Sequence, residues 1–405
     1  MRRPRVAVYH LLPPGGALRV ADALVERTRD RIDYELFRID LGRNDPVPNP
    51  TPDRPEQRVH RYRSRVPFRS SRLYAWTAVL PEVLRLERRI AADIDAGGFD
   101  YAVVHHQRFT QAPSVLGRLR TPTLYFVQEP RRAGFEYDLR PRGLGTGLQE
   151  RLTRLPVAAL DARIRAFDIA QTRAADRILC NSTHSAEYIW RAYGREAEVI
   201  RLGVDGSVFF PVEVNTENQV VAVGALDPSK GHELAIEAVA AVARTQRPRL
   251  LVVYPRGTDA DRARLLDMAH DGDVELTFAT GLTDAELARE YSRSQCTLLC
   301  GRVEPFGLTM VESLACGTPV VGLYEGGYRE VVREGRWGYL VDRRPGNGSA
   351  ALLAAAIEKV QAGSLPVAAQ LRAEVLASHS WDSVVEHYLA AADALLMDWA
   401  EDHRA

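Results

Sequence analysis

The chain has 405 residues, which is more than one hydrophobic core of ordinary size holds and is typical of two domains. Lys plus Arg and Asp plus Glu both total 53, so no positive excess supports a general attraction to nucleic acid, and we expect partners to be recognised at local sites. The four cysteines form no C-x-x-C pair and no cluster with zinc-ligand spacing, which argues against a disulfide framework or a metal site and favours a reducing cytoplasm.

The first residues are basic and then briefly apolar, and the apolar run ends at Pro13-Pro14, so it is too short for a secretory signal. No apolar stretch reaches the roughly 20 residues that a membrane-spanning helix needs. We therefore expect a cytoplasmic protein, with peripheral association at the inner membrane surface left open. Residues 54–72 are rich in arginine and could attract anionic lipid or an acidic acceptor, although a solvated loop is the simpler interpretation.

In chain order, residues 5–10 form an apolar run that predicts a buried strand, followed by a turn and a helix over about 17–29. Residues 44–72 combine proline and arginine with little periodicity, and we expect a loop there. Further strands of the first half are predicted at 100–105, 123–127 and 199–202.

The second half alternates between strand and helix patterns, which is typical of a parallel sheet covered by helices on both faces. We expect an α/β fold with two doubly wound, Rossmann-like domains at residues 1–211 and 212–378, and a final helix within 379–405 that packs back on the first domain. Many unrelated proteins share such a pattern, so it names no function. The predicted strands are 220–223, 250–254, 274–278, 297–299, 319–323 and 339–341, and the predicted helices are 232–244, 261–269, 284–294 and 308–315.

The stretch from Glu304 to Glu312 begins where a predicted strand ends, at the carboxyl edge of the sheet, where open α/β sheets bind ligands. Gly307 allows a close backbone approach, and the free N–H groups of a helix that starts near Leu308 suit a diphosphate. The two carboxylates lie on either side of this anion site, where one could hold a hexose and the other a ribose. Taken alone, either glutamate is more often an ordinary residue near a helix start.

A second cluster follows the first strand of the same half and contains Lys230 in a turn of Gly, Asp, Pro and Ser residues. Such a turn lets a lysine reach over the end of the sheet toward a phosphate. A lone lysine in a loop is usually just solvated, so this second signal is also weak by itself.

Together the two clusters resemble, in order and spacing, those of family 4 of the retaining glycosyltransferases, which have the GT-B fold of two Rossmann-like domains facing a central cleft. The resemblance extends over nearly the whole chain. Gly15-Gly16 is similar to the family's glycine loop, and Gly326-Gly327 with Glu330 to its loop after the following strand. The segments similar to the domain bridge and the crossing helix are Asn181-Ser182, Gly203-Val204-Asp205, Phe210-Pro211 and His379-Ser380-Trp381.

This resemblance implies transfer of a hexose from a nucleotide diphosphate sugar, with retention, to an acceptor on the first domain. Glu304 would contact the sugar, Glu312 the ribose, and Lys230 would neutralise the diphosphate without a metal or other cofactor. The leaving phosphate would deprotonate the acceptor on the same face. The base, the sugar and the acceptor, whether a glycan, a lipid-linked molecule or a small molecule, stay open. The residues implied to line the donor are Gly307, Leu308, Phe306, Gly15 and Gly16.

Two positions depart from the family's pattern. Ala225 stands where the family usually has an arginine that faces the diphosphate, and we hypothesise that Arg256 or Arg302 supplies the missing charge. Gln128 stands where the family often has a histidine near the transferred sugar. Gln128 can exchange hydrogen bonds with the sugar as a neutral histidine does, but it cannot carry charge, which excludes general acid or base work there.

Two further features leave alternatives open. Glu129 is a candidate for sugar or acceptor contacts and equally a structural carboxylate, and His105-His106 is slightly better explained as structural. The rival functions are a nucleotide-sugar epimerase or a phosphorylase of the same architecture, and a catalytically silent subunit that binds nucleotide-sugar or a partner. Ala225 favours the silent subunit, whereas the presence of Glu304, Glu312 and Lys230 together favours the enzyme.

Overall fold

The computed structural model describes residues 2–13, 15–41, 55–62, 75–131 and 148–402. The chain divides into two compact units, which we describe separately: unit 1 comprises Met1–Ile200 with Val385–Ala405, and unit 2 comprises Arg201–Val384. The change between units at Ile200 and Arg201 lies eleven residues before the domain boundary after residue 211 that the sequence suggested. Each unit is an α/β domain around one parallel sheet, so the predicted fold class is confirmed.

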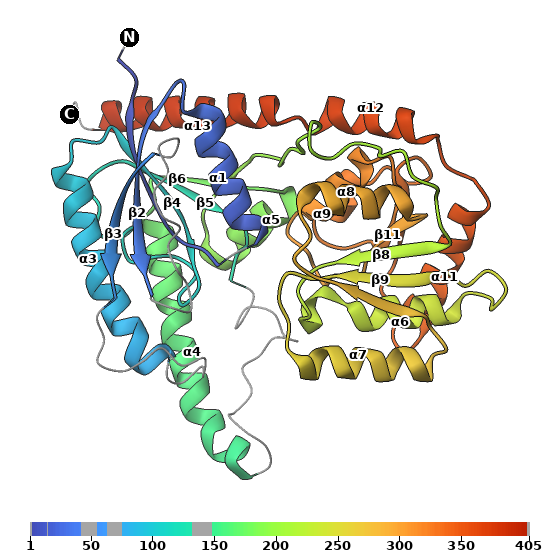
Figure 1. Ribbon diagram of the computed structural model, residues 1–405. Coiled ribbons are helices and arrows are strands. Elements are labelled where there is room, and N and C mark those ends of the chain that lie inside the picture. Colours follow the sequence, from blue (N-terminus) through green and yellow to red (C-terminus); the bar gives the residue numbers. More distant parts are fainter. Residues whose placement is uncertain (1, 14, 42–54, 63–74, 132–147, 403–405) are drawn as a thin grey trace. The chain divides into compact units, whose positions relative to one another are not determined.

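Unit 1 contains a seven-stranded parallel sheet in the order β3-β2-β1-β4-β5-β6-β7 (Figure 1). Strands β1 and β4 are buried along nearly their whole length, as expected for central parallel strands that helices cover on both faces. The strands are β1 (Arg5–Leu11), β2 (Asp33–Asp40), β3 (Glu56–Arg61), β4 (Tyr101–Gln107), β5 (Thr123–Val127), β6 (Arg177–Cys180) and β7 (Glu198–Val199). The helices are α1 (Gly16–Thr28), the π-helical turn η1 (Ala75–Val79), α3 (Leu80–Ala96), α4 (Leu148–Ala174) and α5 (Thr183–Tyr193).

Strand β3 corrects the expectation of a loop throughout residues 44–72. It pairs with β2 in parallel from Glu56 to Arg61 at the edge of the sheet. Its residues are mostly exposed and polar, so they lack the apolar alternation by which a half-buried strand is predicted. The remainder of the Arg-rich segment, residues 54 and 63–72, lies outside the described residues. Within the described part, Arg58 pairs with Glu35 at 2.6 Å and lies over the ring of Phe37.

Unit 2 contains a six-stranded parallel sheet in the order β10-β9-β8-β11-β12-β13. Helices α6 and α7 cover one face and α8 and α9 the other (Figure 1). The strands are β8 (Gln219–Val223), β9 (Arg249–Val253), β10 (Leu276–Ala279), β11 (Cys296–Leu299), β12 (Val320–Leu323) and β13 (Gly338–Val341). The helices are η3 (Pro228–Lys230), α6 (His232–Ala241), α7 (Asp259–Asp271), α8 (Asp284–Arg293), α9 (Leu308–Ala315), α10 (Tyr328–Val331), α11 (Gly348–Gln361) and α12 (Ala368–Ser378).

The last helix, α13 (Trp381–Asp402), begins in unit 2 and runs into unit 1 from Val385 onward. Its unit 1 part is anchored by Tyr388, which is fully buried and whose hydroxyl lies 3.4 Å from that of Tyr34. Near its end, Asp398 pairs with Arg177 of β6 at 3.0 Å. Among the described residues, no helix combines the length and apolar character needed to cross a membrane.

Candidate donor-sugar site in unit 2

The loops that follow β8 and β11 meet at the carboxyl edge of the unit 2 sheet, because these strands are parallel neighbours. There the Lys230 ammonium donates to the Glu304 carboxylate over 2.7 Å. The two side chains are 35% and 21% exposed, so the ion pair is reachable from solvent. The structure thus brings together the two charged groups that the sequence placed in separate clusters.

Lys230 is placed by the turn that precedes α6. Asp227 caps η3 by accepting the Ser229 N–H over 2.8 Å. Gly231 closes the turn with a left-handed φ of 68°, and a Cβ there would meet the Cys300 carbonyl oxygen at 2.1 Å. A Cβ at Gly224 would lie only 3.1 Å from Lys230 Cγ. Glycine at both positions therefore lets the lysine stem pass closely over the sheet edge.

The N-terminus of α9 forms the second part of the site. Gly307 is its N-cap residue, with φ 93°, and no side chain caps the first turn from Leu308 onward. The helix dipole and the N–H groups of this turn favour an anion. A Cβ at Gly307 would meet the Tyr328 ring at 2.4 Å, so only glycine fits against it. Phe306, which precedes the turn, is buried with its ring 6.1 Å from that of His379.

Glu312 lies one turn further into α9 and is 3% exposed. Its Oε2 lies 3.3 Å from the hydroxyl of Tyr291 on α8, which donates to it. One position along, the Ser313 hydroxyl lies 2.7 Å from that of Thr297 on β11 and ties the helix to the sheet. Glu304 and Glu312 therefore lie at different depths: the Glu304 side chain is 21% exposed, and Glu312 is largely buried and oriented by Tyr291.

Tyr328, His232, Tyr291 and Glu325 are site residues that sequence reasoning missed. Burial, and next the negative charge of Glu304, raise the pKa of Tyr328 well above its usual range, so this phenol stays neutral. His232 Nε2 lies 3.0 Å from the Ala225 carbonyl oxygen, and burial lowers the pKa of this imidazole. Tyr291 and Glu325 are revealed only by contacts with residues more than 20 positions away, whereas His232 contacts the turn seven residues before it.

Ala225, Arg256 and Arg302 lie on three loops that converge. Leu226 N donates to the Arg256 carbonyl over 2.9 Å, and Arg302 N donates to the Ser229 carbonyl over 2.8 Å. Both arginines thus lie on loops bonded to the Lys230 turn. Ala225 is 9% exposed, and the Arg256 side chain is exposed. That one of these guanidinium groups replaces the missing arginine stays a prediction.

In unit 1, the expected residues lie at the carboxyl ends of β4 and β5 and the start of α1. Gly15 is the N-cap residue of α1, with φ 153°, and no side chain caps this helix end. Gly16 is the first residue of the helix. Gln128 is buried, and its Nε2 donates to the Ala17 carbonyl over 2.9 Å and lies 3.3 Å from His105 Nδ1. The Gln128 amide thus already holds the first turn of α1.

His105, His106 and Glu129 lie near Gln128. Burial lowers the pKa of His105 to about 3 and that of His106 to about 4, so both imidazoles are neutral at ordinary pH. The Glu129 carbonyl oxygen accepts a hydrogen bond from the Gln111 amide. Among the described residues, no group of three or more His, Cys, Asp or Glu side chains could hold a metal ion.

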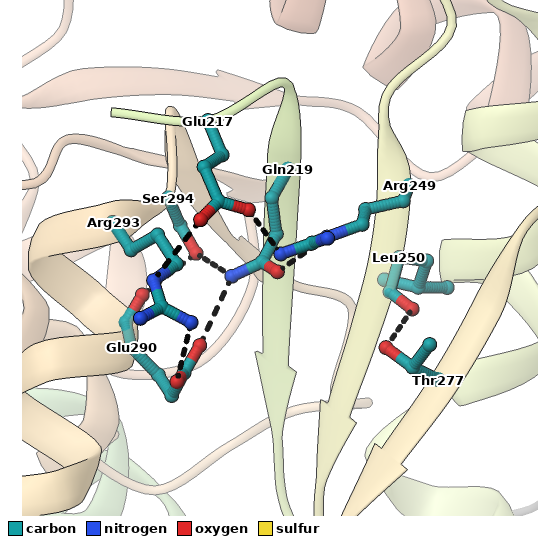
Figure 2. Close-up of polar contacts among 8 residues, drawn as sticks. All are labelled: Glu217, Gln219, Arg249, Leu250, Thr277, Glu290, Arg293 and Ser294. Atoms are coloured by element: carbon teal, nitrogen blue, oxygen red, sulfur yellow. Dashed lines mark hydrogen bonds and ion pairs between the residues drawn. The ribbon is translucent and has the colours of Figure 1, made fainter. Parts of the chain in front are cut away.

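A separate polar cluster lies at the opposite, amino edge of the unit 2 sheet (Figure 2). Gln219 and Arg249 are the first residues of β8 and β9, and Arg249 Nε donates to Gln219 Oε1 over 2.8 Å. Gln219 Nε2 also donates to Ser294 over 2.9 Å, and Glu217 joins Arg249 to Arg293. Because these groups satisfy one another, the cluster fastens β8, β9 and α8 together.

A cavity of about 340 Å³ adjoins this cluster. Its Arg247 guanidinium donates to backbone carbonyls near the ends of α6 and α7, including Ala240 O at 2.6 Å and Asp273 O at 2.7 Å. These hydrogen bonds give the Arg247 guanidinium a structural role in holding the ends of α6 and α7 together. The cavity is lined by Arg244, Arg247, Pro248, Arg249, Asp273 and Glu275.

Comparison with known proteins finds relatives of the unit 2 sequence and of the whole fold. Residues 204–373, which lie within unit 2, match the family model described as glycosyl transferases group 1. The D-inositol 3-phosphate glycosyltransferase of Gordonia bronchialis is 31% identical over 250 residues, or 56% of this chain and 54% of that protein. The chain therefore spans about half the length of the curated relatives it matches.

Several solved structures, including the following two, are similar over almost the full chain. Sucrose-phosphate synthase from Thermosynechococcus elongatus has a TM-score of 0.76 at 20% identity, covering 98% of this chain and 100% of that one. Anabaena HepE in complex with UDP-glucose has a TM-score of 0.69 at 16% identity, covering 97% and 99%. At these identities the likeness shows the fold alone. The chain therefore has the GT-B fold of two Rossmann-like units, and from residue 204 to 373 its sequence is similar to the group 1 glycosyltransferases.

Proposed function

We propose that the protein is a retaining glycosyltransferase that moves a hexose from a nucleotide diphosphate sugar to an acceptor without a metal. The observation that carries this proposal is the accessible Lys230–Glu304 pair, 2.7 Å apart at the carboxyl edge of a sheet that also carries the uncapped N-terminus of α9. A cation, free backbone N–H groups and a carboxylate are together the groups that a diphosphate and a sugar hydroxyl require.

In this mechanism Lys230 leaves Glu304 and pairs with the diphosphate, whose charge grows as the sugar–phosphate bond breaks. The N–H groups at the start of α9 stabilise the same charge. Glu304, released from the lysine, accepts hydrogen bonds from the sugar, and Glu312 accepts hydrogen bonds from the ribose. The leaving phosphate takes the acceptor's proton on the face from which it departs, so that the new bond keeps the configuration of the old one.

Unit 1 binds the acceptor in this proposal, and its sheet carries Gly15, Gly16 and Gln128 at its carboxyl edge. The relatives named D-inositol 3-phosphate glycosyltransferases make a phosphorylated polyol the first acceptor to test. The HepE complex with UDP-glucose makes that nucleotide sugar the first donor to test. A catalytically silent nucleotide-sugar-binding subunit is the second candidate, because Ala225 leaves the diphosphate with one cation fewer than the resemblance implies.

The test is calorimetric binding of UDP, GDP and ADP and their glucose derivatives, with donor hydrolysis measured alongside. We expect one nucleotide to bind the unchanged protein and to bind Glu312→Ala at least tenfold more weakly. Glu275→Ala is the matched control, because Glu275 is exposed at the opposite edge of the same sheet. Binding without hydrolysis or transfer would favour the silent subunit, and binding of no nucleotide would refute both functions.

A further inference from the structure

A row of polar contacts crosses the carboxyl edge of unit 2 from β13 to β8. In the sheet, β8, β11, β12 and β13 are successive neighbours. Arg343 follows β13, Glu325 follows β12, Val303 and Glu304 follow β11, and Lys230 follows β8. Each of these residues is linked to the next by a hydrogen bond, an ion pair or the chain itself. The row therefore leads from Arg343 to the Lys230–Glu304 pair of the candidate site.

The first contact in the row is a two-point ion pair. Arg343 Nε donates to Glu325 Oε1 over 2.5 Å, and Nη2 donates to Oε2 over 3.2 Å. The Glu325 side chain is 18% exposed and that of Arg343 is 35% exposed. A paired guanidinium and carboxylate fix each other's orientation as well as their distance. Glu325 is therefore held in one orientation toward the neighbouring loop.

The second contact restrains an unfavourable backbone conformation. Val303 has a φ of 48°, which is rare for a β-branched residue because its Cβ crowds the backbone. Its N–H donates to Glu325 Oε2 over 3.2 Å. Such a conformation costs about 1–3 kcal/mol and persists only where the surroundings enforce it. The Glu325 carboxylate supplies part of that enforcement.

The backbone of Glu304 is held from the same loop. Gly327 N donates to the Glu304 carbonyl over 2.8 Å. At Gly326, with φ 54°, a Cβ would meet that carbonyl oxygen at 2.2 Å, so the two chain segments touch directly. With its backbone held on both sides, Glu304 directs its carboxylate to Lys230.

We infer that Glu325, oriented by Arg343, is a positioning residue for Glu304. It acts through the Val303 backbone and sets where the Glu304 carboxylate meets the transferred sugar. This inference rests on the proposed function, in which Glu304 holds that sugar. It places the effect of Glu325 on the sugar half of the donor, because the Glu325 carboxylate hydrogen-bonds the backbone of Val303, the residue that precedes Glu304.

The test compares Glu325→Ala and Glu325→Gln with the unchanged protein, using the glucose donor that the unchanged protein hydrolyses and the matching nucleoside diphosphate. We expect Glu325→Ala to lower kcat/KM for the donor about 10- to 100-fold, as a displacement near 1 Å does. Binding of the nucleoside diphosphate should stay within twofold. Glu325→Gln keeps an acceptor for the Val303 N–H, so its kcat/KM should lie between those of the unchanged protein and Glu325→Ala.

Two further variants separate positioning from general damage. Arg343→Ala should resemble Glu325→Ala, and the double variant should be no worse than either, because both act through one contact. Val303→Gly in the Glu325→Ala background should recover several-fold of the lost rate, since glycine adopts a positive φ without strain. Glu275→Ala is again the control.

The outcomes distinguish the two proposals. An unchanged protein that neither hydrolyses a donor nor transfers its sugar would refute the proposed function and this inference with it. An active protein in which Glu325→Ala keeps its kcat/KM would refute this inference alone. The inference would also be refuted if Glu325→Ala weakened binding of the nucleoside diphosphate as strongly as it lowered kcat/KM for the sugar donor. That result would indicate that the whole sheet edge had collapsed.

Discussion

Removal of the Lys230 charge provides the most direct test of the proposed chemistry. We choose Lys230→Met, because methionine keeps an apolar stem where Lys230 Cγ passes within 3.1 Å of the position of a Gly224 Cβ. The Lys230 side chain is 35% exposed, so a surface-like effective dielectric near 20 applies, at which two unit charges 4 Å apart interact by about 4 kcal/mol. Loss of one preorganised donor to a developing charge costs about 2.7–4 kcal/mol in measured enzymes.

We therefore expect kcat of Lys230→Met to fall about 100- to 1000-fold. Stability should change little, because an exposed ion pair contributes about 0–1 kcal/mol. The assay is nucleoside diphosphate release at saturating donor, with a urea titration of the same preparation. Lys230→Arg serves as a partial rescue, since it keeps the charge in a different geometry. A kcat within threefold of the unchanged protein would contradict the assignment of Lys230 to the leaving group.

Three further predictions concern the nucleotide, the missing cation and pH. Glu312→Gln should weaken nucleoside diphosphate binding less than Glu312→Ala by calorimetry, because the amide keeps one acceptor for the ribose; equal losses would contradict ribose binding. Of Arg256→Ala and Arg302→Ala, at least one should slow turnover tenfold or more in the release assay, and two fully active variants would dismiss both as the substitute cation. The unfolding free energy should fall as pH is lowered from 6.5 toward 4. Burial lowers the pKa values of His105 and His106, so in this window the unfolded chain binds protons that the folded chain does not. Each of the two histidines contributes about 1.4 kcal/mol per pH unit to this loss. An unfolding free energy, measured by urea titration, that stays constant between pH 6.5 and 4 would disprove the prediction.

The alternating second half of the sequence was enough to predict the unit 2 strands, because buried parallel strands are continuous apolar runs. The positions of Lys230, Gly307 and Glu304 at one sheet edge were predicted for the same reason, since carboxyl ends of parallel strands share an edge. Strand β3 was missed because an exposed edge strand has no apolar pattern.

The supporting residues could not be found from local patterns. Tyr291 reaches Glu312 from a different helix, and Arg343 reaches Glu325 from a different strand end. The sequences around Tyr291 and Arg343 do not indicate these partners, because residue spacing within one helix or loop predicts only the contacts inside that element. Gln128 shows the converse: its place after β5 was predicted, but its bond to the Ala17 carbonyl depends on the approach of α1.

The course of helix α13 has a consequence for the order in which the protein can form during synthesis. Unit 2 is one uninterrupted stretch of chain, whereas unit 1 needs its final segment from Val385 onward. Until Tyr388 has left the ribosome, the site that it fills beside Tyr34 stays open. Although unit 1 is synthesised first, unit 2 is therefore the first whose chain is complete. A chain cut before Val385 should keep unit 2 whole and leave unit 1 exposed to proteases and aggregation.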